Sequence, residues 1–263
     1  MSERRRLGIP DATYLKPLVH GLEDVGFDLH RDIPARLSIE FRDRPDFLRG
    51  AFLSPIDFAR HGGNFRVLPG VCAASSKPTG TVRLYVNPDR KKISSMAVDI
   101  RVTSEIILAR IILLEKFPNL GTEKDRMTFI PMEPDPSAML KKADAALVVS
   151  FKTGSAPSGL FSLDLVEEWY DLTDCPYVHG MWVVREDGFT DEELHAVIAA
   201  KQRGVDALSS PDFSSSIESF TYDFGTGEVE SVTEFFRYSY YHGILGDVPD
   251  LNFFSPTLDG VGN

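Results

Sequence analysis

Cysteine is scarce in this chain, and no long apolar run occurs in it. Cys72 and Cys175 are the two cysteines of a 263-residue sequence, and neither lies in a metal-binding or redox motif. We therefore expect buried, reduced thiols rather than a disulfide or a nucleophile. No stretch of about 18 apolar residues is present, and the basic start MSERRRLGIP is not followed by the apolar segment of a signal peptide. These absences predict a cytoplasmic chain that neither crosses nor binds a membrane.

Positive charge is also in short supply. The 28 lysines and arginines face 39 aspartates and glutamates, and the resulting net charge of −11 disfavours nucleic acid as a partner. A small anionic ligand is still compatible with this balance, because local cations in a cleft outweigh distant, screened charges. The sequence contains no H-x-x-x-H or C-x-x-C pair, no phosphate-binding glycine loop and no nucleophile elbow. We therefore expect no metal and no cofactor, and nothing in the sequence sets an oligomeric state.

Short apolar strands alternate with amphipathic helices along the chain, which predicts an α/β protein with largely parallel sheets. The capping box that begins at Thr190 predicts a helix start. The strands are expected at Arg6–Pro10, Arg36–Phe41, Ala51–Leu53, Phe65–Pro69, Val71–Ala74, Thr81–Val86, Met96–Ile100, Met127–Pro131, Ala145–Ser150 and Tyr177–Val184. Further helices are expected at Leu15–Val25, Pro45–Gly50, from Ser54-Pro55 onward, at Ser104–Lys116 and at Ser231–Tyr241.

The stretch LDLVEEWYDLTDCPYVHGMW (163–182) organises the rest of the chain. Apolar residues at helical spacing, among them Trp169, follow Asp164, which can cap the start of the helix. The run YVHGMWVV at Tyr177–Val184 is apolar enough for a buried strand, with Gly180 at a point where a side chain is not expected to fit. A helix, a turn and a central strand are therefore predicted here.

This stretch carries DL, EW, T, PYV and W in an order that resembles the chorismate dehydratases of the futalosine route to menaquinone. Further matching pieces are LGIPDATYLKPLVHGL near the start, SPIDFA (54–59), LPG (68–70), TS (103–104) and ADAALVV (143–149). The resemblance spans most of residues 6–256 and identifies the chain as a divergent member. It implies the two-lobed fold of type II periplasmic binding proteins, with a ligand cleft between the lobes. The first lobe is expected to comprise residues 1–85 and 183–263, and the second residues 86–182.

The resemblance is closer in the scaffold than in the cleft. Family members carry a serine on the strand after LPG, and this position falls on Thr81, which retains a hydroxyl. They also carry an asparagine after the first strand, and its position falls on Tyr14 or Lys16, neither of which is an amide. The family's aspartate after the ADA strand is replaced by Phe151. The resemblance therefore implies Thr81, with Tyr14 or Lys16, as the catalytic residues.

A carboxylate ligand needs cations or helix N-termini to bind. Arginine and lysine side chains near strand ends can pair with a carboxylate, although each can also be an ordinary surface cation. Serine and threonine at helix starts either cap the helix or hold an anion on its free N–H groups, and the histidine of the crossing strand is either an acid–base group or a core residue. The expected substrate-binding residues are Ser54, Arg83, Arg101, Thr103, Ser104, Lys152 and His179.

The resemblance implies a cofactor-free carbon–oxygen lyase that eliminates water from chorismate to give 3-enolpyruvylbenzoate, with a carboxylate of the substrate as the base. Two alternatives stay open, because one fold serves both enzymes and binders. The first is a paralogue that acts on another carboxylate. The second is a non-catalytic cytoplasmic protein that binds a small carboxylate. All three readings share a small anionic carboxylate as the partner.

Overall fold

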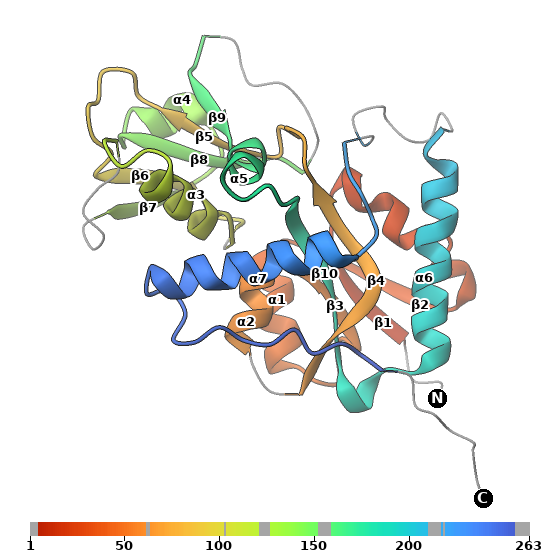
Figure 1. The fold of residues 1–263 in the computed structure, drawn as a ribbon. Helices are drawn as coiled ribbons and strands as arrows, with labels where there is room; N and C mark the ends of the chain where they lie inside the picture. Colours follow the sequence, from red (N-terminus) through yellow and green to blue (C-terminus); the bar gives the residue numbers. More distant parts are fainter. Residues whose placement is uncertain are drawn as a thin grey trace, which may run out of the picture.

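Two five-stranded sheets form the framework of the computed structural model, which describes residues 5–61, 64–102, 104–120, 127–151, 159–209, 217 and 219–255. The first sheet has the order β2-β1-β3-β10-β4 and the second the order β7-β6-β8-β5-β9. Figure 1 shows the first sheet in the lower half of the molecule and the second at the upper left, each with its own helices. The expected α/β architecture is confirmed, but both sheets are mixed instead of largely parallel, because β10 and β5 run antiparallel to their neighbours.

The first sheet is mixed. Strands β1, β2 and β3 run parallel, whereas β10 is antiparallel to both of its neighbours, β3 and β4. Because β10 lies inside the sheet with both faces covered, its apolar run needs no polar alternation. Its strands are β1 (Arg5–Pro10), β2 (Phe27–Asp32), β3 (Gly50–Leu53), β4 (Phe65–Ser75) and β10 (Tyr177–Arg185).

The second sheet pairs β6 in parallel with β7 and β8, and β5 antiparallel with β8 and β9. Its strands are β5 (Val82–Val86), β6 (Ser95–Asp99), β7 (Thr128–Met132), β8 (Ala145–Val149) and β9 (Ser162–Asp164). The α-helices are α1 (Pro34–Asp43), α2 (Pro55–His61), α3 (Ser104–Glu115), α4 (Pro136–Leu140), α5 (Leu165–Thr173), α6 (Asp191–Asp206) and α7 (Thr226–Tyr241). The short 3-10 helices are η1 (Thr13–Val19), η2 (Glu23–Val25), η3 (Glu186–Gly188) and η4 (Ala207–Ser209). No helix in the described part of the chain has the length and apolarity to cross a membrane.

Strand β10 and helix α5 form as the sequence predicts. Asp164 caps α5 by accepting a hydrogen bond from the backbone N–H of Val166, and Trp169 is fully buried, with its Nε1 donating to Ser231 Oγ at 3.0 Å. A Cβ on Gly180 would lie 2.4 Å from the ring of Phe52, so the neighbouring strand leaves room only for glycine. The capping box at Thr190 is also confirmed.

Four local predictions are wrong. The segment Arg36–Phe41 belongs to helix α1 instead of a strand, because Pro34 favours a helix start and Leu37 and Phe41 share the buried face. Residues 15–25 form the 3-10 helices η1 and η2 in place of one α-helix, since Pro17 removes a backbone donor. Residues 45–50 contain a turn rather than a helix, and 65–75 form the single strand β4 instead of two.

The expected lobe boundaries fall inside strands. The boundary after residue 85 cuts β5, which pairs wholly within the second sheet, and the boundary after residue 182 cuts β10, which pairs wholly within the first. We therefore propose that the lobes divide at the two crossing segments, 76–81 and 174–176. A bridge between Val67 and Phe253 returns the C-terminal segment to the first sheet.

Candidate functional site

The carboxyl edges of the two sheets meet, and this is the edge at which open α/β sheets bind ligands. From the first sheet, β1 leads into η1 and β3 leads into Ser54 and α2; from the second, β6 leads toward α3. Seven residues with interacting polar or aromatic side chains lie at this edge, and we call them the junction cluster. They are Tyr14, Ser54, Asp57, Ser104, Glu105, Tyr177 and His179.

Backbone hydrogen bonds tie the two edges together. The Thr13 backbone N–H and hydroxyl both donate to the carbonyl of Phe151, at 2.9 and 3.2 Å. Phe151 follows β8, and its neighbour Ser150 donates its backbone N–H to the Thr81 carbonyl at 2.8 Å. The start of η1 therefore lies directly against the end of β8 and the start of β5.

Aromatic rings form one wall of the junction cluster. The ring of Tyr14 stacks on Phe220 at 4.6 Å and lies 5.5 Å from His179, which is 4.9 Å from the ring of Tyr177. Burial raises the pKa of Tyr14 and of Tyr177 far above neutrality, aided by the Glu105 charge. Both phenols therefore stay protonated and available as hydrogen-bond donors.

His179 is a neutral imidazole with an unused nitrogen. Burial lowers its pKa to about 3, so the ring carries no charge at neutral pH. Its Nε2 is buried and has no hydrogen-bond partner among the described residues. Buried polar atoms in proteins almost always have a protein or water partner. This nitrogen is therefore a candidate hydrogen-bonding atom for a ligand or a water molecule in the junction cluster.

Glu105 supplies an acid–base group to the cluster. Its carboxyl lies in the first turn of α3, where burial raises its pKa to about 7 and the Asp57 and Asp99 charges act in the same direction. Hydrogen bonds from the backbone N–H groups of Glu105 and Ser104 oppose the shift. A carboxyl with a pKa near neutrality can donate or accept a proton under ordinary conditions.

Two serines of the cluster differ in how they are used. Ser54 donates to the Asp57 carboxylate at 2.6 Å and accepts from the Asp57 backbone N–H at 3.3 Å, so it acts as the cap of α2. The Ser104 hydroxyl is buried next to the Tyr177 phenol, whose pKa it lowers slightly against the effect of burial. Ser104 is thus the more available of the two for a ligand.

Two of the predicted cations are paired with carboxylates of the chain. Lys16 is exposed on η1, and the Arg83 guanidinium lies 3.9 Å from Asp164. Arg101 holds the Asp99 carboxylate with two nitrogens, at 2.8 and 2.6 Å, and donates to the Val149 carbonyl at 2.7 Å. The structure therefore brings together Tyr14, Ser54, Ser104 and His179. Arg101 lies close to this junction, with its guanidinium 4.9 Å from the ring of Phe151, but Asp99 and the Val149 carbonyl already bind it. Thr103 and Lys152 lie outside the described residues.

The remaining predicted residue, Thr81, is fully buried at the start of β5. Its hydroxyl is 2.6 Å from the hydroxyl of Thr79, and its carbonyl accepts from Ser150. The backbone carbonyl of Thr81 therefore contacts the end of β8 beside the site, while its hydroxyl is hydrogen-bonded to Thr79.

Replacing Arg101 by glutamine is expected to lower the free energy of unfolding by about 1–3 kcal/mol, because Asp99 then remains as a buried carboxylate without its cation. The loss is moderate because Asp99 also accepts backbone hydrogen bonds from Arg101 and Val149. Urea unfolding of R101Q, D99N and the double variant measures the coupling free energy between Arg101 and Asp99. A double variant no more stable than R101Q would contradict the assigned pairing.

One group in the described part of the chain has the spacing of a metal site. Potential ligand atoms of His30, Asp32 and Glu40 lie within 4.8 Å of one another. His30 and Glu40 are already hydrogen-bonded at 2.8 Å, and Arg36 and Arg44 pair with the two carboxylates. Positive charge already neutralises these carboxylates, so the group is better described as an ion-pair network.

Comparison with known proteins places this geometry in a family. The crystal structure of protein AF1704 from Archaeoglobus fulgidus superposes with a TM-score of 0.70 at 14% identity, covering 93% of this chain and 99% of that one. The CA3427 gene product of Candida albicans, described as having the generic periplasmic binding protein fold, gives 0.61 at 12% identity, covering 98% and 99%. The periplasmic aliphatic sulphonate binding protein of Escherichia coli gives 0.58 at 12%, covering 100% and 96%.

These likenesses establish the periplasmic-binding-protein fold for the chain. A search of curated protein sequences finds no match. The family model described as menaquinone biosynthesis matches residues 5–241, which include every member of the junction cluster. The chain therefore belongs to the menaquinone biosynthesis family.

Proposed function

We propose that this chain eliminates water from a chorismate-type cyclic carboxylate bound in the junction cluster, yielding 3-enolpyruvylbenzoate from chorismate. The observation that carries the proposal is Glu105, a half-buried carboxyl whose pKa is raised to about 7 by burial and by the charges of Asp57 and Asp99. Membership of the menaquinone biosynthesis family supports a role in that pathway. Glu105 supports this particular reaction because elimination of water requires a proton for the leaving hydroxyl.

Neutral donors hold the carboxylates of the substrate in this proposal. The phenols of Tyr14 and Tyr177 stay protonated, and the Ser104 hydroxyl lies beside them. The first turn of the 12-residue helix α3 adds free N–H groups and the positive end of the helix dipole. A substrate carboxylate at this position competes with Glu105 for the same N–H groups and so keeps Glu105 protonated.

The reaction breaks one C–H and one C–O bond of the ring. A carboxylate of the substrate takes the ring proton, the electron pair of the C–H bond forms the new double bond, and the hydroxyl leaves with its electron pair. Protonated Glu105 gives its proton to that hydroxyl, so water departs, and the proton held by the substrate then returns to Glu105. Glu105 is a better donor than Thr81, because the Thr81 hydroxyl is already bound to Thr79.

Incubation of the purified chain with chorismate, followed by proton NMR, tests the proposal. We expect the signals of the non-aromatic ring to disappear and those of an aromatic enolpyruvyl product to appear at the same rate. Calorimetry on the same sample separates turnover from binding. Chorismate that binds without change supports a binding protein, and chorismate that neither binds nor reacts contradicts the proposal.

A further inference from the structure

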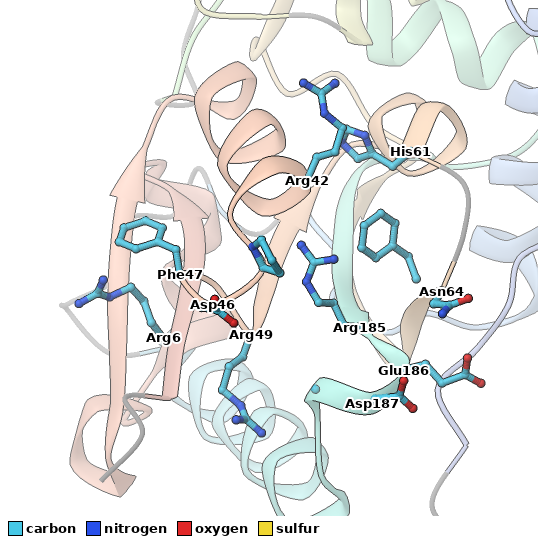
Figure 2. Close-up of a pocket in the computed structure, with 13 residues that line it drawn as sticks. Arg6, Arg42, Asp46, Phe47, Arg49, His61, Asn64, Arg185, Glu186 and Asp187 are labelled. Atoms are coloured by element: carbon cyan, nitrogen blue, oxygen red, sulfur yellow. The ribbon is translucent and has the colours of Figure 1, made fainter. Parts of the chain in front are cut away.

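A polar cavity lies at the opposite edge of the first sheet from the junction cluster. Its volume is about 1050 Å³, and it is formed at the starts of β1, β3 and β4 and the end of the antiparallel strand β10. Figure 2 shows Arg185 near its centre, with Arg42 above and Arg49 below. We call it the arginine pocket and define it by Arg6, Arg42, Arg49, Arg185, Phe47 and Phe65.

Three of the four arginines have carboxylate partners. Arg6 pairs with Asp28 at 2.7 Å and Arg42 with its neighbour Asp43 at 2.6 Å. Arg49 lies 3.1 Å from the buried carboxylate of Glu193, the residue that closes the capping box of α6. The charges of these three guanidinium groups are thus largely balanced inside the chain.

Arg185 differs from these three arginines, because no carboxylate of the described residues lies within ion-pair distance of it. It donates to the backbone carbonyl of Phe41 in the last turn of α1 and lies 4.8 and 5.1 Å from the rings of Phe41 and Phe65. Burial lowers its pKa, and the charge of Asp46 opposes that effect only from a distance. A carbonyl and two ring faces stabilise a cation less than an anion does.

We propose that the arginine pocket binds a small organic monocarboxylate, with its carboxylate on Arg185 and its body against Phe65 and Pro45. The rings and Pro45 give the cavity apolar walls. Two acidic residues on the lining, Asp46 and Asp187, disfavour ligands with several negative charges, whereas the third, Glu186, pairs with Arg66 at 2.6 Å. The pocket is a binding site separate from the junction cluster, and it does not depend on the proposed reaction.

Titration with benzoate by ligand-observed NMR and calorimetry tests this site, with citrate as the polyanionic comparison. We expect benzoate to bind, and Arg185→Gln to weaken its binding about tenfold or more, since a hydrogen bond to a charged group is lost. Arg42→Gln is expected to weaken it about two- to fivefold, and Asp46→Asn to strengthen it about twofold, through charge alone. Citrate binding more tightly than benzoate would contradict the proposed ligand class.

The variants also locate the bound benzoate. Arg42 and Asp46 are exposed and at the opposite edge from the junction cluster, so their effects report on the arginine pocket alone, even if Arg185→Gln fails to fold. Arg237→Gln, on the exposed face of α7, is the matched control for loss of one positive charge. Equal benzoate affinity in the wild type, Arg42→Gln and Asp46→Asn would overturn the proposal.

Discussion

Replacement of Glu105 by glutamine is expected to lower chorismate turnover by about 10²–10⁴-fold, the usual contribution of a general acid. Glutamine keeps the shape and hydrogen bonds of the side chain but has no proton to give. In the wild type, kcat/KM is expected to fall as pH rises above about 7, where Glu105 of the free protein loses that proton. Initial rates from pH 5.5 to 8.5 for both proteins measure these effects, with the exposed Glu192→Gln on α6 as control.

The same substitution is expected to stabilise the fold above pH 7. Because the pKa of Glu105 is raised from 4.5 to about 7, the folded chain retains a proton that the unfolded chain loses between these values. The contribution of Glu105 to the free energy of unfolding therefore falls as pH rises through this window, by about 1–3 kcal/mol in total. Glu105→Gln removes this loss.

His179 acts in the opposite direction and has to be separated from Glu105. Its pKa is lowered from 6.5 to about 3, so its contribution to stability falls as pH drops below 6.5. Between pH 4.5 and 6.5 the two contributions cancel in the wild type. The difference between wild type and Glu105→Gln in urea unfolding at pH 5 and pH 8 isolates Glu105. A difference that does not change with pH, together with unchanged turnover, would remove Glu105 from the site.

Gly204→Ala is expected to be the most destabilising single substitution proposed here, at about 3–5 kcal/mol. Gly204 lies where α6 packs on η1, and a Cβ there would be 2.1 Å from the Pro17 carbonyl oxygen and 2.5 Å from its Cα. These are backbone atoms, which cannot rotate away as a side chain can, so α6 and η1 have to separate. Because η1 carries Tyr14, ligand affinity at the junction cluster is expected to fall as well.

Gly227→Ala is the matched control for this substitution. Gly227 lies in α7, and the nearest atom to its added Cβ is Pro176 Cδ at 4.0 Å. Alanine there is expected to raise stability by up to about 1 kcal/mol through its higher helix propensity. Thermal and urea unfolding of both variants give the comparison. If Gly204→Ala lowers the free energy of unfolding by no more than the amount by which Gly227→Ala changes it, the close packing of α6 on η1 is contradicted.

Residue patterns predicted the buried strands well but missed two edge strands, β2 and β9. The run YVHGMWVV is too apolar for an exposed position, and it forms β10, which lies between β3 and β4 inside the first sheet. The stretch Arg36–Phe41 alternates like a strand, yet Ile39 is 52% exposed, because only Leu37 and Phe41 are needed on the buried face of α1. Strand β2 pairs on one side only, and its residues FDLHRD lack the apolar content that identifies a strand.

The site was predicted in part, and the rest depends on contacts between distant residues. The resemblance pointed to Tyr14 and Ser104, which the structure brings to the same junction, but the neighbouring Glu105 was missed. Nothing in a helix start reveals that Asp57, 48 positions earlier in the chain, lies near enough to raise its pKa. The pairing of Arg101 with Asp99 is local, and their spacing of two residues favours an ion pair within the chain over a cation available to a ligand.

The hydrogen bonds from Thr13 to Phe151 bear on how quickly a ligand exchanges. They join the two edges directly beside Tyr14, and breaking both bonds has a net cost of about 1–3 kcal/mol. A form in which the edges have separated there is therefore about 5- to 150-fold rarer than the joined form. For a ligand that enters by this route, association and release slow by the same factor and the affinity is unchanged, so residence time depends on a pair of groups that need not contact the ligand.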